Sequence, residues 1–211
     1  SLRHALGATY PRAGTVRCED RGRQQRDGFS IEWLLLGSGR GECLPATLLS
    51  PDGVGRRAPA TLVVHPAGKE ALFVGRGKRV PGPWVASLLE RGHKVLLMDL
   101  FLSGEVAPAS GESAYVDEGP RGFFTTYNRS IAAWRVQDLL TALSYLEGRD
   151  DVGAKSVIGL GSTGLLCLFA SSCADGIDRI YAEVEDFDLG DDEAWAEHCL
   201  IPGVRSAGDV R

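Results

Sequence analysis

Residues 159–164 (GLGSTG) have the types and spacing that support chemistry at a turn between a strand and a helix. They follow the apolar run 156–160 and precede the apolar segment 165–173. As a G-x-G-x-x-G pattern, the turn would let a pyrophosphate approach a helix N-terminus, and an acid about 20 residues later would contact a ribose. Glu183 and Glu185 lie 19 and 21 residues after the last glycine. One hypothesis is therefore that this turn binds a dinucleotide or a small anion.

The same turn also fits the nucleophile elbow G-x-S-x-G, which raises a serine above the edge of a sheet. Two registers fit the pattern. The first places Gly161 at the nucleophile position, where no side chain is available to attack a substrate. The second places Ser162 there but puts the bulky Leu160 where the turn needs a small residue, so sterics favour the first. A third interpretation is structural: the glycines allow close packing of the helix on the sheet and bind nothing.

Short apolar runs alternate with helical patterns on both sides of this turn. Strands are predicted at 61–65, 94–100, 156–160 and 179–184, and helices at 83–91, 132–146 and 165–173. Such alternation predicts a parallel sheet with helices on both faces. The fold class is therefore α/β, a three-layer α/β/α sandwich with a mainly parallel sheet.

The first part of the chain has a different pattern. Apolar residues alternate in 29–35 and continue in 43–49 after a glycine turn, which predicts an N-terminal antiparallel pair. Residues 1–28 show neither strand nor helix periodicity. We therefore expect an irregular N-terminal arm at 1–28, followed by a single domain at 29–211.

The amino-acid composition argues against several kinds of binding partner. The formal net charge is -5, which argues against a nucleic-acid-binding surface. No run of about 18 apolar residues is present, so a membrane span is not predicted. The five cysteines include no C-x-x-C pair and indicate neither a disulfide framework nor a zinc site. We expect a soluble domain without metal, cofactor, nucleic acid or membrane partner.

The order of several motifs carries more information than the turn alone. The motifs are His65 to Lys69 (HPAGK) after the first buried strand, Met98-Asp99 followed by Gly104-Glu105, Tyr127-Asn128-Arg129 before the helix that contains Trp134-Arg135, and the elbow-like turn. In this order they resemble the α/β-hydrolase superfamily, especially its acetylxylan-esterase and dienelactone-hydrolase-like branch. The resemblance covers about residues 29–205.

The resemblance implies a carboxylic-ester hydrolase that transfers an acyl group through a serine. It places Ser162 as the nucleophile, with Asp186 and His198 as the acid and base that follow in chain order. Backbone N–H groups at Gly68 and Lys69 would stabilise the oxyanion, together with the elbow at Gly161 and the residue after it.

The chain departs from the family pattern at three places. Glycine stands at the favoured nucleophile position, His198 lies in an acidic segment, and the sequence stops before the family's last strands. We therefore expect a degenerate elbow and a C-terminally truncated or shortened member that is weakly active or inactive as given. The expected ligand is a small ester or an acetylated carbohydrate. A missing terminal strand would expose a sheet edge, through which a homo-oligomer could form.

Overall fold

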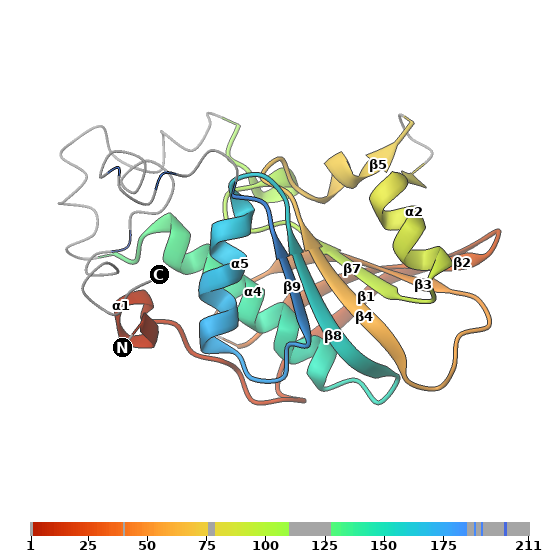
Figure 1. Cartoon of the computed structure of the whole chain (residues 1–211), viewed down its shortest axis with the longest axis horizontal. Coiled ribbons are helices and arrows are strands. Elements are labelled where there is room, and N and C mark those ends of the chain that lie inside the picture. The colour runs from red at the N-terminus through yellow and green to blue at the C-terminus, as the bar shows by residue number, and fades with distance from the viewer. Residues whose placement is uncertain are drawn as a thin grey trace.

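The computed structural model describes residues 2–39, 41–75, 79–109 and 128–184, together with residues 188, 191 and 201. Within these residues one large sheet has the strand order β1-β2-β3-β7-β4-β8-β9 (Figure 1). Its strands are β1 (Arg17–Arg26), β2 (Phe29–Gly37), β3 (Leu44–Pro51), β4 (Ala58–Val64), β7 (Lys94–Met98), β8 (Val152–Gly159) and β9 (Arg179–Ala182). A separate antiparallel pair consists of β5 (Phe73–Val74) and β6 (Val80–Pro81).

The large sheet has an antiparallel half and a parallel half. Strands β1, β2, β3 and β7 pair antiparallel in that order, whereas β4 pairs parallel with both β7 and β8, and β8 pairs parallel with β9. This confirms the predicted antiparallel pair and the predicted α/β class. Because parallel strands end at the same edge of a sheet, the loops after β7, β4 and β8 meet there, where α/β folds usually bind ligands.

Helices cover both faces of the sheet (Figure 1). They are α1 (Leu2–Leu6), α2 (Pro83–Glu90), α4 (Ile131–Glu147) and α5 (Thr163–Cys173), with short 3₁₀ turns η1 (Lys69–Leu72) and η2 (Gly104–Val106). Successive residues of β7 face opposite layers: Leu96 packs in the core under α4 and α5, and Leu97 packs in the core under α2. The three predicted layers are therefore present, and α2, α4 and α5 confirm the predicted helices.

The N-terminal segment differs from the prediction of an irregular arm. It contains α1, whose Leu6 is buried in the main core, and β1, which pairs with β2 from Arg17 opposite Gly37 to Arg26 opposite Phe29. Almost every side chain of β1 is exposed, so no apolar alternation indicates a strand in the sequence. The irregular-arm prediction was wrong because backbone pairing with β2, rather than side-chain burial, forms this strand.

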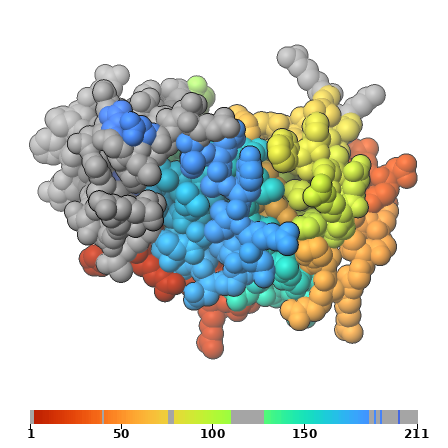
Figure 2. Space-filling view, in the orientation of Figure 1, coloured from red at the N-terminus to blue at the C-terminus, as the bar shows by residue number. Residues whose placement is uncertain are grey.

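Strand β9 forms an exposed edge of the sheet. Among the described strands it pairs with β8 alone, and Ile180 and Tyr181 are 40% and 52% exposed. The ring of Trp84 on α2 lies 6.2 Å from the ring of Tyr181, centroid to centroid. Figure 2 shows the blue surface of β9 beside the yellow-green surface of α2. An apolar surface therefore lies next to a strand edge that pairs with no other strand in the described part of the chain.

Two glycines let α5 lie unusually close to the sheet. A Cβ atom at Gly159 would lie 2.7 Å from the Sγ atom of Cys167, and a Cβ atom at Gly164 would lie 2.1 Å from the carbonyl oxygen of Glu183. Neither separation is compatible with a side chain. The close helix-on-sheet packing that the sequence allowed for these glycines is therefore observed.

We expect Gly164→Ala to destabilise the protein by about 1–3 kcal/mol or more, because the added methyl group forces α5 away from the backbone after β9. Urea unfolding monitored by circular dichroism measures the change. Gly55→Ala is the matched control, since a Cβ atom there meets no atom within 4 Å. Equal stability of the two variants would contradict the packing described here.

Candidate functional site

The turn after β8 has the geometry of an elbow with glycine at its apex. Strand β8 ends at Gly159, and Gly161 has a φ of 51°. Ser162 already has right-handed helical angles (φ -61°, ψ -12°), and α5 begins at Thr163. A positive φ at the apex is strained for any residue with a Cβ atom and relaxed for glycine. The geometry thus matches the register that places Gly161, rather than Ser162, at the apex.

Hydrogen bonds fix this turn to the end of the neighbouring strand β4. The carbonyl oxygen of Val64 accepts hydrogen bonds from the Leu160 N–H at 3.1 Å and from the Thr163 hydroxyl at 3.2 Å. A Cβ atom at Gly161 would lie 3.3 Å from Cγ of Pro66. The elbow therefore lies directly beside the 65–69 loop.

The carboxylate of Glu183 lies against the elbow. Its Oε2 atom accepts a hydrogen bond from the Gly161 N–H at 2.6 Å, and its own N–H donates to the Gly159 carbonyl oxygen at 2.9 Å. Ser162 is exposed, and neither its hydroxyl nor its N–H hydrogen-bonds to any residue that the structure describes. An anion at this helix N-terminus would have to displace the Glu183 carboxylate.

The amides of the 65–69 loop already have acceptors within the protein. The Gly68 N–H donates to the His65 carbonyl oxygen at 2.9 Å, and the Lys69 N–H donates to Oδ1 of Asp99 at 2.7 Å. The resemblance implies that these two N–H groups donate to a substrate oxyanion. To do so, each would have to break its present hydrogen bond and form one to the substrate. The oxyanion role of Gly68 and Lys69 stays a prediction.

The side chain of Lys69 makes a buried ion pair that joins two loops. Its Nζ atom lies 2.5 Å from Oδ2 of Asp99 and 2.9 Å from Oε1 of Glu105, and the side chains of Lys69 and Asp99 are 2% and 0% exposed. Glycine is required on both sides of this pair, because a Cβ atom at Gly68 or Gly104 would lie within 2.6 Å of Asp99. The pair therefore connects the loop after β4 to the loop after β7.

The remaining predicted catalytic residues, Asp186 and His198, lie outside the described residues. Ser162, Gly161, Gly68 and Lys69 lie at the same edge of the sheet, at the ends of β4 and β8. Among the residues that the structure describes, no group of three or more His, Cys, Asp or Glu side chains could hold a metal ion.

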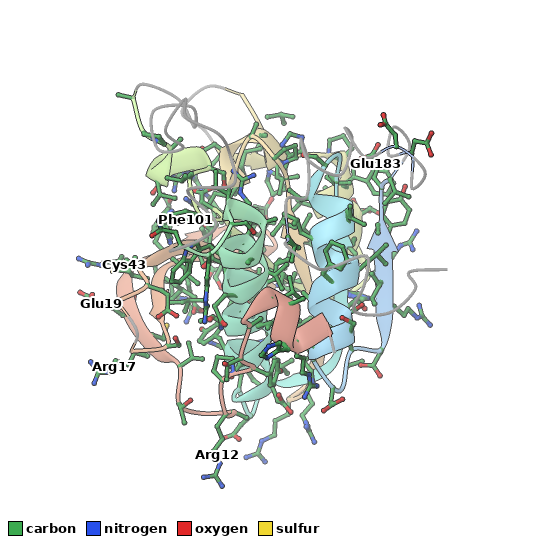
Figure 3. The ribbon with its side chains drawn as sticks, turned by 90° about the vertical axis from the view of Figure 1, so that its left-hand side faces the viewer. Arg12, Arg17, Glu19, Cys43, Phe101 and Glu183 are labelled. Carbon is green, nitrogen blue, oxygen red and sulfur yellow. The ribbon has the colours of Figure 1, made fainter. Side chains whose placement is uncertain are left out.

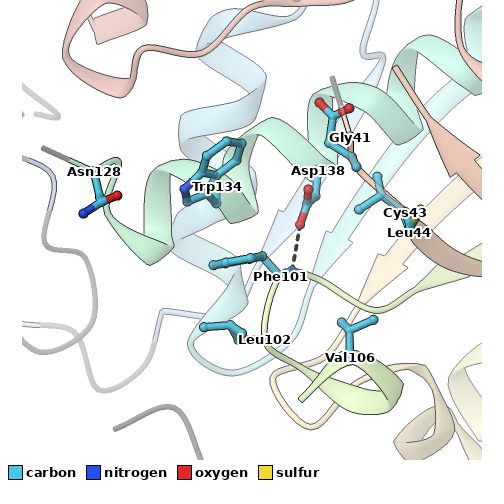
Figure 4. A pocket seen from close by; sticks show the side chains of 10 residues that line it. Gly41, Cys43, Leu44, Phe101, Leu102, Val106, Asn128, Trp134 and Asp138 are labelled. Atoms are coloured by element: carbon cyan, nitrogen blue, oxygen red, sulfur yellow. Dashed lines mark hydrogen bonds between the residues drawn. The ribbon is translucent and has the colours of Figure 1, made fainter. Parts of the chain in front are cut away.

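The sequence did not single out Asp138, which is buried in the middle of α4 and 3% exposed. Its Oδ2 atom accepts a hydrogen bond from the Phe101 N–H at 2.7 Å (Figure 4). The pKa of the Asp138 carboxyl is raised to about 8, mainly by burial and also by the nearby Glu42, and the Phe101 N–H and Arg135 oppose this shift. Nearly every residue of α4 between 132 and 146 is buried, and the run of mostly apolar and small residues at 139–146, directly after Asp138, is the signal that could have indicated this.

Solved structures with the same arrangement of strands and helices identify the fold. A Bacteroides fragilis NCTC 9343 protein described as a candidate acetyl xylan esterase matches 85% of this chain with a TM-score of 0.67 at 15% identity. The chain has an α/β-hydrolase fold. A glucuronoyl esterase from Solibacter usitatus (TM-score 0.58, 14% identity) and acetyl xylan esterase 1 from Thermoanaerobacterium sp. JW/SL YS485 (TM-score 0.57, 15% identity) each match 85% of the chain.

The chain spans about half the length of those structures: the matches cover 50%, 56% and 55% of the three proteins. No protein-family model and no curated protein sequence matches it. In the described part of the chain, no helix combines the length and the apolar character needed to cross a membrane.

We expect Lys69→Met to destabilise the protein by about 3–5 kcal/mol, because it leaves the Asp99 carboxylate buried without its cation. Chemical denaturation at neutral pH tests this. Arg21→Met is the control: it removes an exposed pair with Glu19, which contributes at most about 1 kcal/mol. A loss for Lys69→Met no larger than that of the control would contradict the structural role of the pair.

The raised pKa of Asp138 makes stability depend on pH. Between about pH 4 and pH 8 the unfolded chain has released the proton that the folded protein retains, so the free energy of unfolding falls as pH rises through this window. The slope is at most about 1.4 kcal/mol per pH unit for one group. Asp138→Asn has no proton to release at this position, so its free energy of unfolding does not fall for this reason. We therefore expect the free energy of unfolding of the variant minus that of the natural protein to increase from pH 4 to pH 8.

Urea titrations at several pH values measure this difference, and Asp150→Asn, at an exposed position, provides the control. If the difference in free energy of unfolding between Asp138→Asn and the natural protein stayed constant from pH 4 to pH 8, the expectation would be wrong.

Proposed function

We propose that this chain is a domain of carboxylic-ester hydrolase lineage whose elbow carries glycine in place of the nucleophile. It is therefore weakly active or inactive toward esters in this form. The observation that carries the proposal is the φ of 51° at Gly161 at the apex between β8 and α5. The turn keeps the shape of a nucleophile elbow, and the position that would project a hydroxyl has no side chain.

The solved structures support the lineage and the class of ligand. Their names are acetyl xylan esterase and glucuronoyl esterase, and both describe enzymes that cleave esters. By analogy, the ligand proposed for this chain is a small ester or an acetylated carbohydrate, bound where the loops after β4 and β8 meet.

Residual esterase activity, if measured, is assigned to Ser162 as nucleophile, with His198 as base and Asp186 as the orienting acid. Ser162 is exposed beside the apex, and its N–H makes no hydrogen bond to the described residues. However, its backbone is already helical, so its hydroxyl is not held at the apex. This geometry supports weak activity at most.

Binding of a dinucleotide or small anion at residues 159–164 has less support. The N–H of Gly161 is occupied by the Glu183 carboxylate at 2.6 Å, and a negative charge there repels a phosphate. Formation of a homo-oligomer through β9 stays part of the proposal, supported by the exposed Ile180 and Tyr181 on this sheet edge.

We expect the natural chain and Ser162→Ala to hydrolyse p-nitrophenyl acetate at equal rates close to the rate in buffer. In serine hydrolases, loss of the nucleophile lowers kcat on the order of 10⁶-fold. We expect Gly161→Ser to react with a fluorophosphonate probe, since it places a hydroxyl at the apex next to the Ser162 N–H, which donates to none of the described residues. Peptide mass spectrometry locates the labelled residue.

Labelling of the natural chain at Ser162 would contradict the degenerate elbow. A folded Gly161→Ser variant that stays unlabelled would contradict the assignment of Gly161 to the apex of a nucleophile elbow. Circular dichroism provides the control for folding.

A further inference from the structure

A pocket of about 410 Å³ opens between the β2–β3 connection, the loop after β7 and the first turns of α4 (Figure 4). Its lining includes Leu44, Leu102, Val106, Trp134 and Asp138. This volume lies in the range of sites for small organic ligands, which are mostly apolar with a few placed polar groups.

The pocket is separate from the elbow. Strands β7 and β8 are separated by β4, and neighbouring strands lie about 4.8 Å apart, so the two loops start roughly 10 Å from each other. In Figure 3, Cys43 and Phe101 of the pocket lie toward one side of the molecule and Glu183 of the elbow toward the other. A ligand in the pocket would therefore contact residues that the proposed esterase site does not use.

The walls of the pocket fit a flat ring. Phe101 and Trp134 both line it, with ring centroids 6.0 Å apart and planes tilted by 40°. Leu44, Leu102 and Val106 supply aliphatic surface around them. A ring placed among these side chains would remove apolar surface from water on both sides of the contact.

Asp138 provides a single buried polar anchor in these apolar walls. One carboxyl oxygen accepts the Phe101 N–H at 2.7 Å, and the other has no hydrogen-bond partner among the described residues. This oxygen is not among the fully buried side-chain atoms that lack a partner, so it can be reached from the pocket, and a ligand that pairs with it gains a hydrogen bond. Since burial raises the pKa of this carboxyl to about 8, the carboxyl is protonated at neutral pH and can donate a hydrogen bond.

Charge selects among ligands of this shape. Glu42 also lines the pocket and is one of the groups that raise the Asp138 pKa. Its negative charge repels an anionic ligand. Neutral Asp138 can donate its proton in a hydrogen bond to an uncharged oxygen of a ligand.

The wall that carries Phe101 is held in place before any ligand binds. Asp138 accepts the Phe101 N–H, and Nε of Arg135 donates to the Phe101 carbonyl oxygen at 2.9 Å. The next residue, Leu102, has a φ of 58°, a left-handed conformation that is unfavourable for a leucine. Such strain persists where the surroundings impose it, and it is often found at ligand sites.

We propose that this pocket is a binding site for a small, uncharged ring compound whose oxygen accepts a hydrogen bond from Asp138. The ring of the ligand packs between the aromatic and aliphatic walls. The oxygen of the ligand accepts a hydrogen bond from the protonated carboxyl oxygen of Asp138 that does not bond to the Phe101 N–H. The site does not depend on the elbow, so it can be tested whether or not the chain cleaves esters.

Benzamide and benzoate form a matched pair of probes, because they share one ring and nearly one shape but differ in charge. Titration of the full chain, followed by protein-detected NMR at pH 7, gives the two dissociation constants. We expect benzamide to bind at least about tenfold more tightly than benzoate, which is 1.4 kcal/mol. Absence of benzamide binding, or equal affinity for benzoate, would overturn the proposal.

Val106→Trp locates the binding site. Val106 is 38% exposed, so its replacement fills the pocket without adding bulk to the core. Val74→Trp is the matched control, since Val74 is 48% exposed on β5 and does not line the pocket. We expect loss of benzamide binding in the first variant alone. Equal affinity in both variants would place the ligand elsewhere and overturn the proposal.

Asp138→Asn tests the anchor, because an amide donates a hydrogen bond at every pH. In the natural protein we expect benzamide affinity to fall as pH rises above about 8, when Asp138 loses its proton. In the variant we expect the affinity measured at neutral pH to persist at pH 9. The same weakening in both proteins would show that Asp138 does not hold the ligand.

Discussion

The buried pair of Lys69 and Asp99 is the interaction on which the functional edge of this domain depends. It joins the loop after β4, which lies beside the elbow, to the loop after β7, which forms a wall of the pocket. A buried ion pair is stable only when its geometry is good and its other hydrogen-bonding groups are satisfied. Asp99 meets this condition, because it also accepts hydrogen bonds from the N–H groups of Lys69 and Glu105.

The elbow and the pocket use this shared framework in different ways. At the elbow, the exposed Gly161 and Ser162 lie next to the Glu183 carboxylate and can be reached from solvent. In the pocket, Asp138 is buried and its charge is suppressed by its surroundings. One edge of an α/β-hydrolase sheet therefore offers both a polar, open position and an apolar, enclosed one. Function in such folds follows from side chains at this edge rather than from the fold itself.

Much of the fold could be predicted because each buried strand and helix carries its own local pattern. The run at 94–100 predicted β7, and the spacing within 132–146 predicted α4, since burial on one or two faces leaves a periodic trace in the sequence. The position of Gly161 at the apex was also predictable, because a tight turn with positive φ constrains local residue type. Strand β1 was missed because its side chains are exposed and its stability comes from pairing with β2.

The sequence by itself determined the alternation of strands and helices, the elbow at 159–164 and the lack of a side chain at its apex. All of these depend on residues close together in the chain. Only the tertiary structure decided that the Lys69 side chain holds Asp99, that Glu183 contacts the Gly161 N–H, and that Asp138 is buried beside Phe101. These contacts join residues 22 to 37 positions apart. Such distant groups meet only when the sheet order brings their loops to one edge, and no local pattern encodes that order.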